Sequence, residues 1–418
     1  MAKLTRRTLL FAAAPPSLLD AVRALPNFCS HEHWGSIESI GTFPGGYRAD
    51  LEPGALPQRA TQLGDLLDEP YLRGWIRNGG GALPQHQATG AYQCTRRGML
   101  ALYGVDIQRA AGSSALDQTI AAKYGKLFQW YGAAMKKAGF SRLIRIVHPE
   151  YYVRPAGAAD GVTETIMRVD PLLDLWRPET ARRKDLVAMA QVDPQDAASW
   201  RQFLERIFAL AERGGALGTK QLQGYRRSLH YEVRADGDIR RWTGDLTPNE
   251  VTVFQDWVMH ECSRLAHERG WPHQVHVGTH NLSQSSPLPL ESLGRRYPRM
   301  KIVMIHCWPF FAEAGWLAKQ VPNLYLDTCW LPVLNPNFFR QAMEQWWNYV
   351  PLHKITCGHD STTVEMATGS SLYTREILAE LGGEQLRRHS ATRTEVLGAI
   401  GGFLHGNAEL LYGPKRSA

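Results

Sequence analysis

The sequence lacks the long apolar runs, paired cysteines and basic stripes that mark several broad classes of protein. None of its apolar runs approaches the roughly 20 residues that a membrane-spanning helix needs. Its formal charge of +7 is scattered over 418 residues, and without a basic stripe or a reading motif we expect no nucleic-acid binding. Its six cysteines show no CxxC spacing, so we expect small buried residues in place of a structural zinc knot or a disulfide framework.

The first residues are similar to an export signal. Thr5-Arg6-Arg7-Thr8-Leu9-Leu10 resembles the twin-arginine signature, and a short apolar stretch follows it. Val22-Arg23-Ala24 offers a small-x-small cleavage site. We therefore expect residues 1–24 to be a signal segment, removed from a periplasmic or secreted protein. The alternative is a mature N-terminal helix with a basic start, in a cytoplasmic protein.

Beyond about residue 140, short apolar segments alternate with amphipathic ones. Helical spacing predicts helices over 197–213 and from Phe254 to Leu265, with others at about 310–320 and 337–349. Near-continuous apolar strands between such helices predict a parallel sheet covered by helices. The expected strands are eight in number: 28–30, 142–147, 186–192, 216–222, 273–277, 301–305, 324–326 and 354–357.

Eight such units make a (β/α)8 TIM barrel over residues 25–413 the predicted fold. A doubly wound open sheet is the alternative, but that fold usually carries a Gly-rich phosphate loop after the first strand, where this chain has HEHWG. Residues 36–120 are rich in Gly and Pro, with short helical pieces such as Asp65 to Arg77. We interpret them as a long insertion after the first strand, lying over the active face.

Polar residues stand at the carboxyl ends of most of these strands. The first strand ends at His31 and His33, and side chains two apart on a strand point to the same side. The other ends carry His148, Lys220, His276, His306 and the pair His359-Asp360. Each match alone is weak, because a lone histidine at a strand end is usually a packed core or rim residue. Their convergence on one end of a predicted barrel favours an active site.

Three imidazoles and a carboxylate suit zinc or another borderline divalent ion. An open coordination position would hold a water whose pKa the metal lowers to near neutral. Asp360 could then bind the metal and take a proton, while His306 could polarise a substrate carbonyl or donate a proton.

These motifs resemble the amidohydrolase superfamily, and within it the amidohydrolase-2 branch of metal-dependent hydrolases and decarboxylases. The similarity rests on HEH at 31–33, QVHVG at 274–278, IH at 305–306, GHDS at 358–361 and FLHGNAELLY at 403–412. It implies a TIM barrel that acts on a small molecule and binds a divalent metal ion, expected to be Zn²⁺. The resemblance does not decide between one ion and two. A homodimer is also expected, because barrels of this branch often dimerise.

Carried over by position, the resemblance makes His31, His33, His276 and Asp360 metal ligands, with His306 as the catalytic or second-metal histidine. Some superfamily members carboxylate a strand-four lysine to bridge two metals, although this is not general in the amidohydrolase-2 branch. Lys220 is therefore a candidate bridging or substrate-binding residue, and the alternative is a buried lysine paired with a carboxylate. Two positions depart from the pattern: His359 replaces a small or hydroxyl residue, and Cys29-Ser30 precede the HxH in place of an aspartate.

Arginine forks suit a carboxylate, so Arg226, with Arg227 beside it, is a candidate for holding an acidic substrate. Trp34, Trp308 and Trp330 follow strand ends and could line a pocket for a ring. We expect a metal-dependent hydrolase of a C–N or C–O bond in an amide, cyclic amide or lactone. The alternative is a non-oxidative decarboxylase of an aromatic or unsaturated acid. A third hypothesis, a non-catalytic binding protein on a retained barrel, is disfavoured by the intact ligand set.

Overall fold

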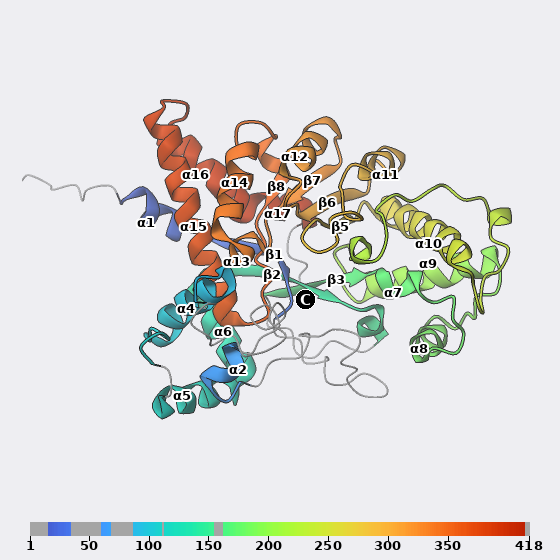
Figure 1. Ribbon diagram of the computed structural model, residues 1–418, viewed down its shortest axis with the longest axis horizontal. Coiled ribbons are helices and arrows are strands. Elements are labelled where there is room, and N and C mark those ends of the chain that lie inside the picture. Colours follow the sequence, from blue (N-terminus) through green and yellow to red (C-terminus); the bar gives the residue numbers. More distant parts are fainter. Residues whose placement is uncertain (1–15, 35–59, 68–86, 111–112, 154–161, 414–418) are drawn as a thin grey trace, which may run out of the picture.

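A computed structural model describes residues 16–34, 60–67, 87–110, 113–153 and 162–413 (Figure 1). Its strands form one eight-stranded sheet in sequential order, and every neighbouring pair is parallel. The first and last strands meet at their carboxyl ends, where the Asp360 N–H donates to the His31 carbonyl at 3.0 Å. The fold is therefore a nearly closed TIM barrel, as the sequence predicts. The strands are β1 (Asn27–Glu32), β2 (Phe140–Val147), β3 (Thr163–Arg168), β4 (Thr219–Gln221), β5 (Pro272–Val277), β6 (Lys301–His306), β7 (Leu324–Asp327) and β8 (Ile355–Thr356).

Helices surround this sheet, and Figure 1 shows α2, α4, α5 and α6 on one side of the barrel and α7, α8 and α9 on the opposite side. The helices are α1 (Leu18–Arg23), α2 (Leu63–Leu67), α4 (Gly90–Tyr103), α5 (Ser114–Tyr124), α6 (Leu127–Ala138), α7 (Asp170–Leu173), α8 (Ala181–Ala190), α9 (Ala197–Arg213), α10 (Pro248–Arg269), α11 (Leu290–Arg296), α12 (Phe311–Gln320), α13 (Leu331–Leu334), α14 (Pro336–Trp346), α15 (Val364–Arg387), α16 (Arg393–Gly401) and α17 (Asn407–Tyr412). No helix in the described ranges is long and apolar enough to cross a membrane.

One predicted strand is wrong. Residues 186–192 lie mostly in α8, and the third strand of the barrel is β3, which the sequence pattern missed. The segment is rich in Leu, Ala, Met and Gln, which favour a helix. Its buried members Leu186 and Ala190 are four residues apart and so share one helical face. The Thr180 side chain caps the start of the helix, which ends at Gln191 in a left-handed conformation.

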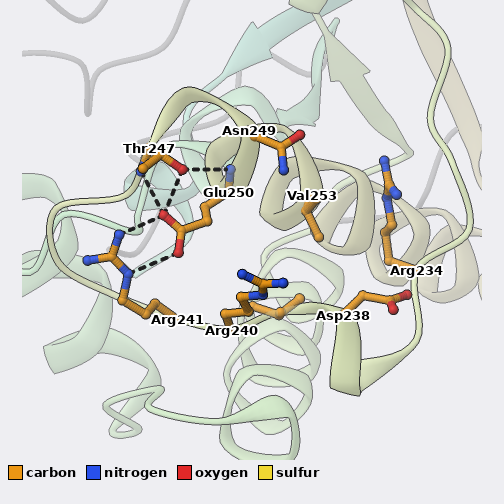
Figure 2. A pocket seen from close by; sticks show the side chains of 9 residues that line it. Arg234, Asp238, Arg240, Arg241, Thr247, Asn249, Glu250 and Val253 are labelled. Carbon is orange, nitrogen blue, oxygen red and sulfur yellow. Dashed lines mark hydrogen bonds and ion pairs between the residues drawn. The ribbon is translucent and has the colours of Figure 1, made fainter.

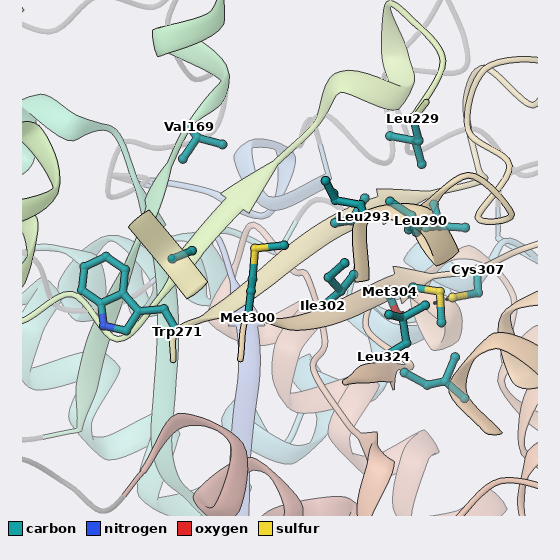
Figure 3. Packing of buried hydrophobic residues seen from close by; sticks show 14 of the residues in the cluster. Val169, Leu229, Trp271, Leu290, Leu293, Met300, Ile302, Met304, Cys307 and Leu324 are labelled. Carbon is teal, nitrogen blue, oxygen red and sulfur yellow. Dashed lines mark hydrogen bonds between the residues drawn. The ribbon is translucent and has the colours of Figure 1, made fainter. Parts of the chain in front are cut away.

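The barrel core is packed on both sides of the sheet. Outside it, Figure 3 shows Ile302 and Met304 of β6 and Leu324 of β7 near Leu290 and Leu293 of α11. Inside it, an apolar cluster that includes Phe28, Ile144, Ile146, Ile166, Val303 and Ile305 packs on Leu411 and Tyr412 of α17. The barrel therefore has a filled interior, which leaves the carboxyl ends of the strands to build the site.

The described part of the predicted insertion 36–120 packs beside the barrel. Helix α4 crosses α15 at very close range: a Cβ added at Gly98 would lie 1.7 Å from the Glu365 carbonyl oxygen, and one at Gly369 would lie 1.7 Å from that of Cys94. The helical piece expected from Asp65 to Arg77 is described only as far as Leu67, where α2 ends. Coverage of the active face by the insertion stays a prediction.

The N-terminal segment carries a short helix against the core. Residues 1–15 lie outside the described residues, whereas α1 lies within the predicted signal segment 1–24. Val22 of α1 is fully buried, and the α1 helix contacts α15 and α16. Cleavage after Ala24 would remove this contact, so the leader and the periplasmic location stay predictions.

Candidate active site

The candidate site is centred on Asp360, which follows β8 and is buried at 3% exposure. Its Oδ1 lies 3.0 Å from Nε2 of His33 and 3.6 Å from Nε2 of His31. Its Oδ2 lies 3.3 Å from Nε2 of His306. Although burial opposes ionisation, the imidazoles of His31 and His33 hold the pKa of this carboxyl well below its ordinary range. The structure thus brings four predicted site residues to one point.

The two histidines of the HxH motif face the same side, as expected. Their ring centroids are 5.4 Å apart. His31 Nδ1 lies 2.6 Å from Oε1 of Gln274, whose amide donates to the Ser30 carbonyl and to the Tyr412 hydroxyl. Because Gln274 accepts from Nδ1, it fixes the tautomer that leaves Nε2 of His31 bare.

Glu32, between the two histidines, contacts Ser361 and Cys29. Its Oε2 accepts the N–H of Ser361 at 2.7 Å, and its Oε1 lies 3.3 Å from the Cys29 thiol. Burial raises the pKa of Glu32 well above its usual value. This carboxyl therefore ties β1 to the loop that carries Asp360, which is a structural role beside the site.

His276 and His306 come from the neighbouring strands β5 and β6, and their ring centroids are 4.5 Å apart. Nδ1 of His306 lies 2.8 Å from the Cys329 carbonyl oxygen, so it donates there and leaves Nε2 towards Asp360. Nε2 of His276 lies 2.7 Å from Oγ1 of Thr279, so Nδ1 is the ring nitrogen that this contact does not engage. Burial lowers the pKa of His306 to about 3 and that of His276 well below its usual value, so both rings are neutral.

These residues fit a divalent metal ion. Within the described part of the chain, Nε2 of His31, Nδ1 of His276 and Nε2 of His306 are buried without a hydrogen-bond partner. Such atoms are costly unless something else meets them. His31, His33 and Asp360 offer ligand atoms within 4.8 Å of one another, and so do His306, Cys329 and Asp360. Neutral imidazoles around a shared carboxylate are the donors that Zn²⁺ and similar ions prefer.

The two predicted basic residues lie in different surroundings. Lys220 on β4 is 1% exposed, and burial lowers the pKa of its ammonium to about 8 while Asp360 acts in the opposite direction. Arg226 follows a short 3-10 turn (Gln223–Tyr225), its side chain is 74% exposed, and it pairs with Asp174 at 2.9 Å. Lys220 therefore belongs to the buried cluster, whereas the partner of Arg226 is a carboxylate at the surface.

Aromatic residues that the sequence did not single out border the histidines. The Tyr225 ring is 4.4 Å from that of His276 and 4.5 Å from that of His280, and His280 stacks on Trp330 at 5.3 Å. Of the three predicted pocket tryptophans, Trp330 lies 5.3 Å from His306. The other two pack elsewhere: Trp34 on Tyr131 and Phe140, and Trp308 on Phe338.

A cavity of about 500 Å³ lies apart from these residues, between the loop after β4 and the start of α10 (Figure 2). Arg241 lies across from Glu250, with two hydrogen bonds of 3.0 and 2.6 Å. Thr247 caps the helix and also bonds Glu250. None of the predicted site residues lines this cavity, and the charges that Figure 2 shows joined serve to fix the loop on the helix.

Comparison with known proteins places the chain in a family. The amidohydrolase family model matches residues 133–360, which is more than half of the chain. The protein therefore belongs to the amidohydrolase family, as the strand-end motifs suggested. It is also 28% identical over 183 residues to protein fluG of Emericella nidulans, a match that covers 36% of this chain and 21% of that protein. The chain thus spans about a fifth of the curated relative it matches.

Solved structures share the whole fold at low identity. A uronate isomerase from Bacillus halodurans is 14% identical with a TM-score of 0.71, covering 94% of this chain and 95% of that one. A uronate isomerase from Thermotoga maritima is 14% identical with a TM-score of 0.68, covering 94% and 96%. A protein of Lactobacillus casei, provisionally assigned as a metal-dependent hydrolase, is 18% identical with a TM-score of 0.64, covering 95% and 97%. This similarity supports the fold alone, so the reaction has to be inferred from the residues of the site.

Proposed function

We propose that the protein is a metal-dependent hydrolase of a C–N or C–O bond in an amide, cyclic amide or lactone. The observation that carries this proposal is the buried, ionised carboxylate of Asp360 within 3.6 Å of imidazole nitrogens of His31, His33 and His306. A carboxylate in that position serves as a ligand and also as the acceptor for a proton released by an attacking water. Membership of the amidohydrolase family is consistent with this chemistry.

The metal is proposed to be Zn²⁺, held by His31, His33, Asp360 and His276. When bound there, such an ion supplies a Lewis acid and lowers the pKa of a coordinated water towards neutral. The groups of His306, Cys329 and Asp360 lie close enough together to offer a second position. The proposal therefore leaves the number of ions at one or two.

His306 acts beside Asp360 on the reacting carbonyl. Its Nδ1 is engaged by the Cys329 carbonyl, so the lone pair of Nε2 faces the site. In this tautomer Nε2 carries no proton, so the ring takes one before it can donate one. Asp360 accepts the proton of the attacking water, and His306, whose Nε2 lies 3.3 Å from Oδ2 of Asp360, relays that proton to the leaving group as the bond breaks.

Lys220 is proposed to hold an anionic group of the substrate. Its strand partner in register is Arg168 at the end of β3, so two cationic side chains start from neighbouring positions. Because burial lowers its pKa to about 8, Lys220 can also lose its proton and become the neutral amine that carboxylation requires. A carboxylated lysine that bridges two metal ions is therefore the competing role. The same two cations favour non-oxidative decarboxylation of a carboxylic acid as the second candidate function.

The experiment is a screen of the zinc-loaded protein against three substrate classes. Lactones and amides are followed by acid or amine release, carboxylated aromatic acids by carbon dioxide release, and uronic acids by isomerisation. We expect turnover of a lactone or amide that is lost in Asp360→Asn. Carbon dioxide release without hydrolysis would replace the hydrolase proposal with the decarboxylase, and isomerisation of a uronic acid would overturn both.

The assembly of the protein is a separate prediction. We propose a homodimer, as expected for this branch of the superfamily. Light scattering of the purified full chain tests this, and a monomer mass across the working concentration range would contradict it.

A further inference from the structure

The chain turns sharply after β5, through two consecutive residues with a left-handed backbone. Gly278 has φ +72°, and a Cβ there would lie 1.8 Å from the Trp308 carbonyl oxygen, so only glycine fits. Thr279 follows with φ +67°. A β-branched residue rarely adopts this conformation, and such backbone strain gathers at functional sites.

The turn places the hydroxyl of Thr279 between two imidazoles. Its Oγ1 lies 2.7 Å from Nε2 of His276 and 3.1 Å from Nδ1 of His280. It also lies 2.8 Å from the Gly278 carbonyl oxygen, to which the hydroxyl donates its single proton. With that proton engaged, the oxygen can only accept, so His276 carries its hydrogen on Nε2.

The consequence concerns the other nitrogen of the same ring. Nδ1 of His276 is then unprotonated, and it is buried without a hydrogen-bond partner among the described residues. The rings of Tyr225 and His306, at 4.4 and 4.5 Å, hold the imidazole in place. His280, stacked on Trp330, fixes the hydroxyl from its outer side.

We propose that Thr279 is a positioning residue that selects the Nε2–H tautomer of His276 and so presents a bare Nδ1 to the metal. The inference rests on the proposed metal site, but the tautomer is a property of the metal-free protein. The strained backbone of Thr279 is explained by this role, because an extended backbone at this position would carry the side chain away from His276.

The test compares Thr279→Ser with Thr279→Ala, which lose the same methyl group and differ only in the hydroxyl. Thr279→Val keeps the shape and the strain of threonine without the acceptor. Nitrogen NMR of metal-free, histidine-labelled protein reports the tautomer of His276, whose signal is assigned by its loss in His276→Gln. Chelator competition then gives the zinc affinity.

We expect Thr279→Ser to resemble the wild type in both measurements. Thr279→Ala and Thr279→Val should lose the pure Nε2–H signature, and zinc affinity should fall by about 10- to 100-fold, the usual effect of removing a group that orients a ligand. An unchanged tautomer in both variants would overturn the inference. If the tautomer changes but the wild type binds no zinc, the inference stands and the proposed metal function falls.

Discussion

Asp360 Oδ1 lies 3.0 Å from Nε2 of His33, so the last strand of the barrel delivers a carboxylate directly to the histidine at the end of the first. Backbone contacts enforce this meeting: the N–H of Asp360 donates to the His31 carbonyl, and that of His33 to the Ser361 carbonyl. The same contacts between the ends of β1 and β8 therefore close the barrel and bring the site residues together.

Replacing His31 should remove most of the metal. Purified wild-type protein should contain about one equivalent or more of zinc by elemental analysis, and His31→Ala should lose most of it because the variant lacks a buried ligand nitrogen. His353→Ala is the matched control, since that histidine is exposed and precedes β8 at the far end of the strand. Equal metal content in all three proteins would exclude His31 as a ligand.

Asp360→Asn tests the role of the carboxylate with little change in size. We expect kcat to fall by about 10²- to 10⁴-fold on the substrate found in the screen, the usual effect of losing a positioned proton acceptor. Steady-state kinetics of zinc-saturated protein checks this, with circular dichroism to show that the barrel is intact. A variant that keeps more than half of the wild-type kcat would contradict a catalytic role for Asp360.

The strand-end residues were predictable because parallel strands bring their carboxyl ends to one face. His31, His33, His276, His306 and Asp360 each follow or end an apolar run, and the structure gathers them. The missed strand β3, TETIMR, has only two adjacent apolar residues, Ile166 and Met167, so it is not an apolar run. The sequence predicts a strand over residues 186–192 because their apolar stretch is short. In so short a stretch, the period of two of a strand cannot be told from the 3.6-residue period of a helix.

Residues that act through long-range contacts could not be found from local patterns. Asp327 accepts the N–H groups of Cys329 and Gly358 at 2.8 and 3.0 Å, and it contacts the hydroxyls of Ser30 and Thr356. No local sequence pattern around Asp327 predicts its hydrogen-bond partners on β1 and β8. The role of Gln274 likewise depends on its hydrogen bonds to His31, Ser30 and Tyr412, which the barrel brings together.

Lys220→Met separates the two proposed roles of this lysine. If Lys220 holds a substrate anion, zinc content should stay constant while KM for the anionic substrate rises by about 10- to 100-fold, since a charged hydrogen bond contributes about 1.5–3 kcal/mol. Lys220→Arg, which keeps the positive charge, is the matched comparison. Loss of zinc in Lys220→Met, restored by a short carboxylic acid, would show instead that the lysine is carboxylated and bridges two ions.

The buried His273 should make the metal-free protein less stable in mild acid. Its Nδ1 lies 2.8 Å from Oγ1 of Thr219 and its Nε2 lies 3.2 Å from the Gln221 amide, and burial lowers its pKa from 6.5 to about 4. The unfolded chain therefore binds a proton more tightly than the folded chain does. The stability due to neutral His273 is fully present above about pH 6.5 and is lost as the pH falls towards 4.

Between these limits one such group adds a slope of up to about 1.4 kcal/mol per pH unit to the free energy of unfolding. His273→Gln keeps hydrogen-bonding groups for Thr219 and Gln221 but does not titrate, so its slope should be smaller by up to that amount. Urea titrations at a series of pH values, in the presence of a chelator, measure the difference. His353→Gln makes the same exchange at an exposed histidine and is the matched control. An identical slope for His273→Gln and the wild type would mean that His273 is not neutral and buried in the folded protein.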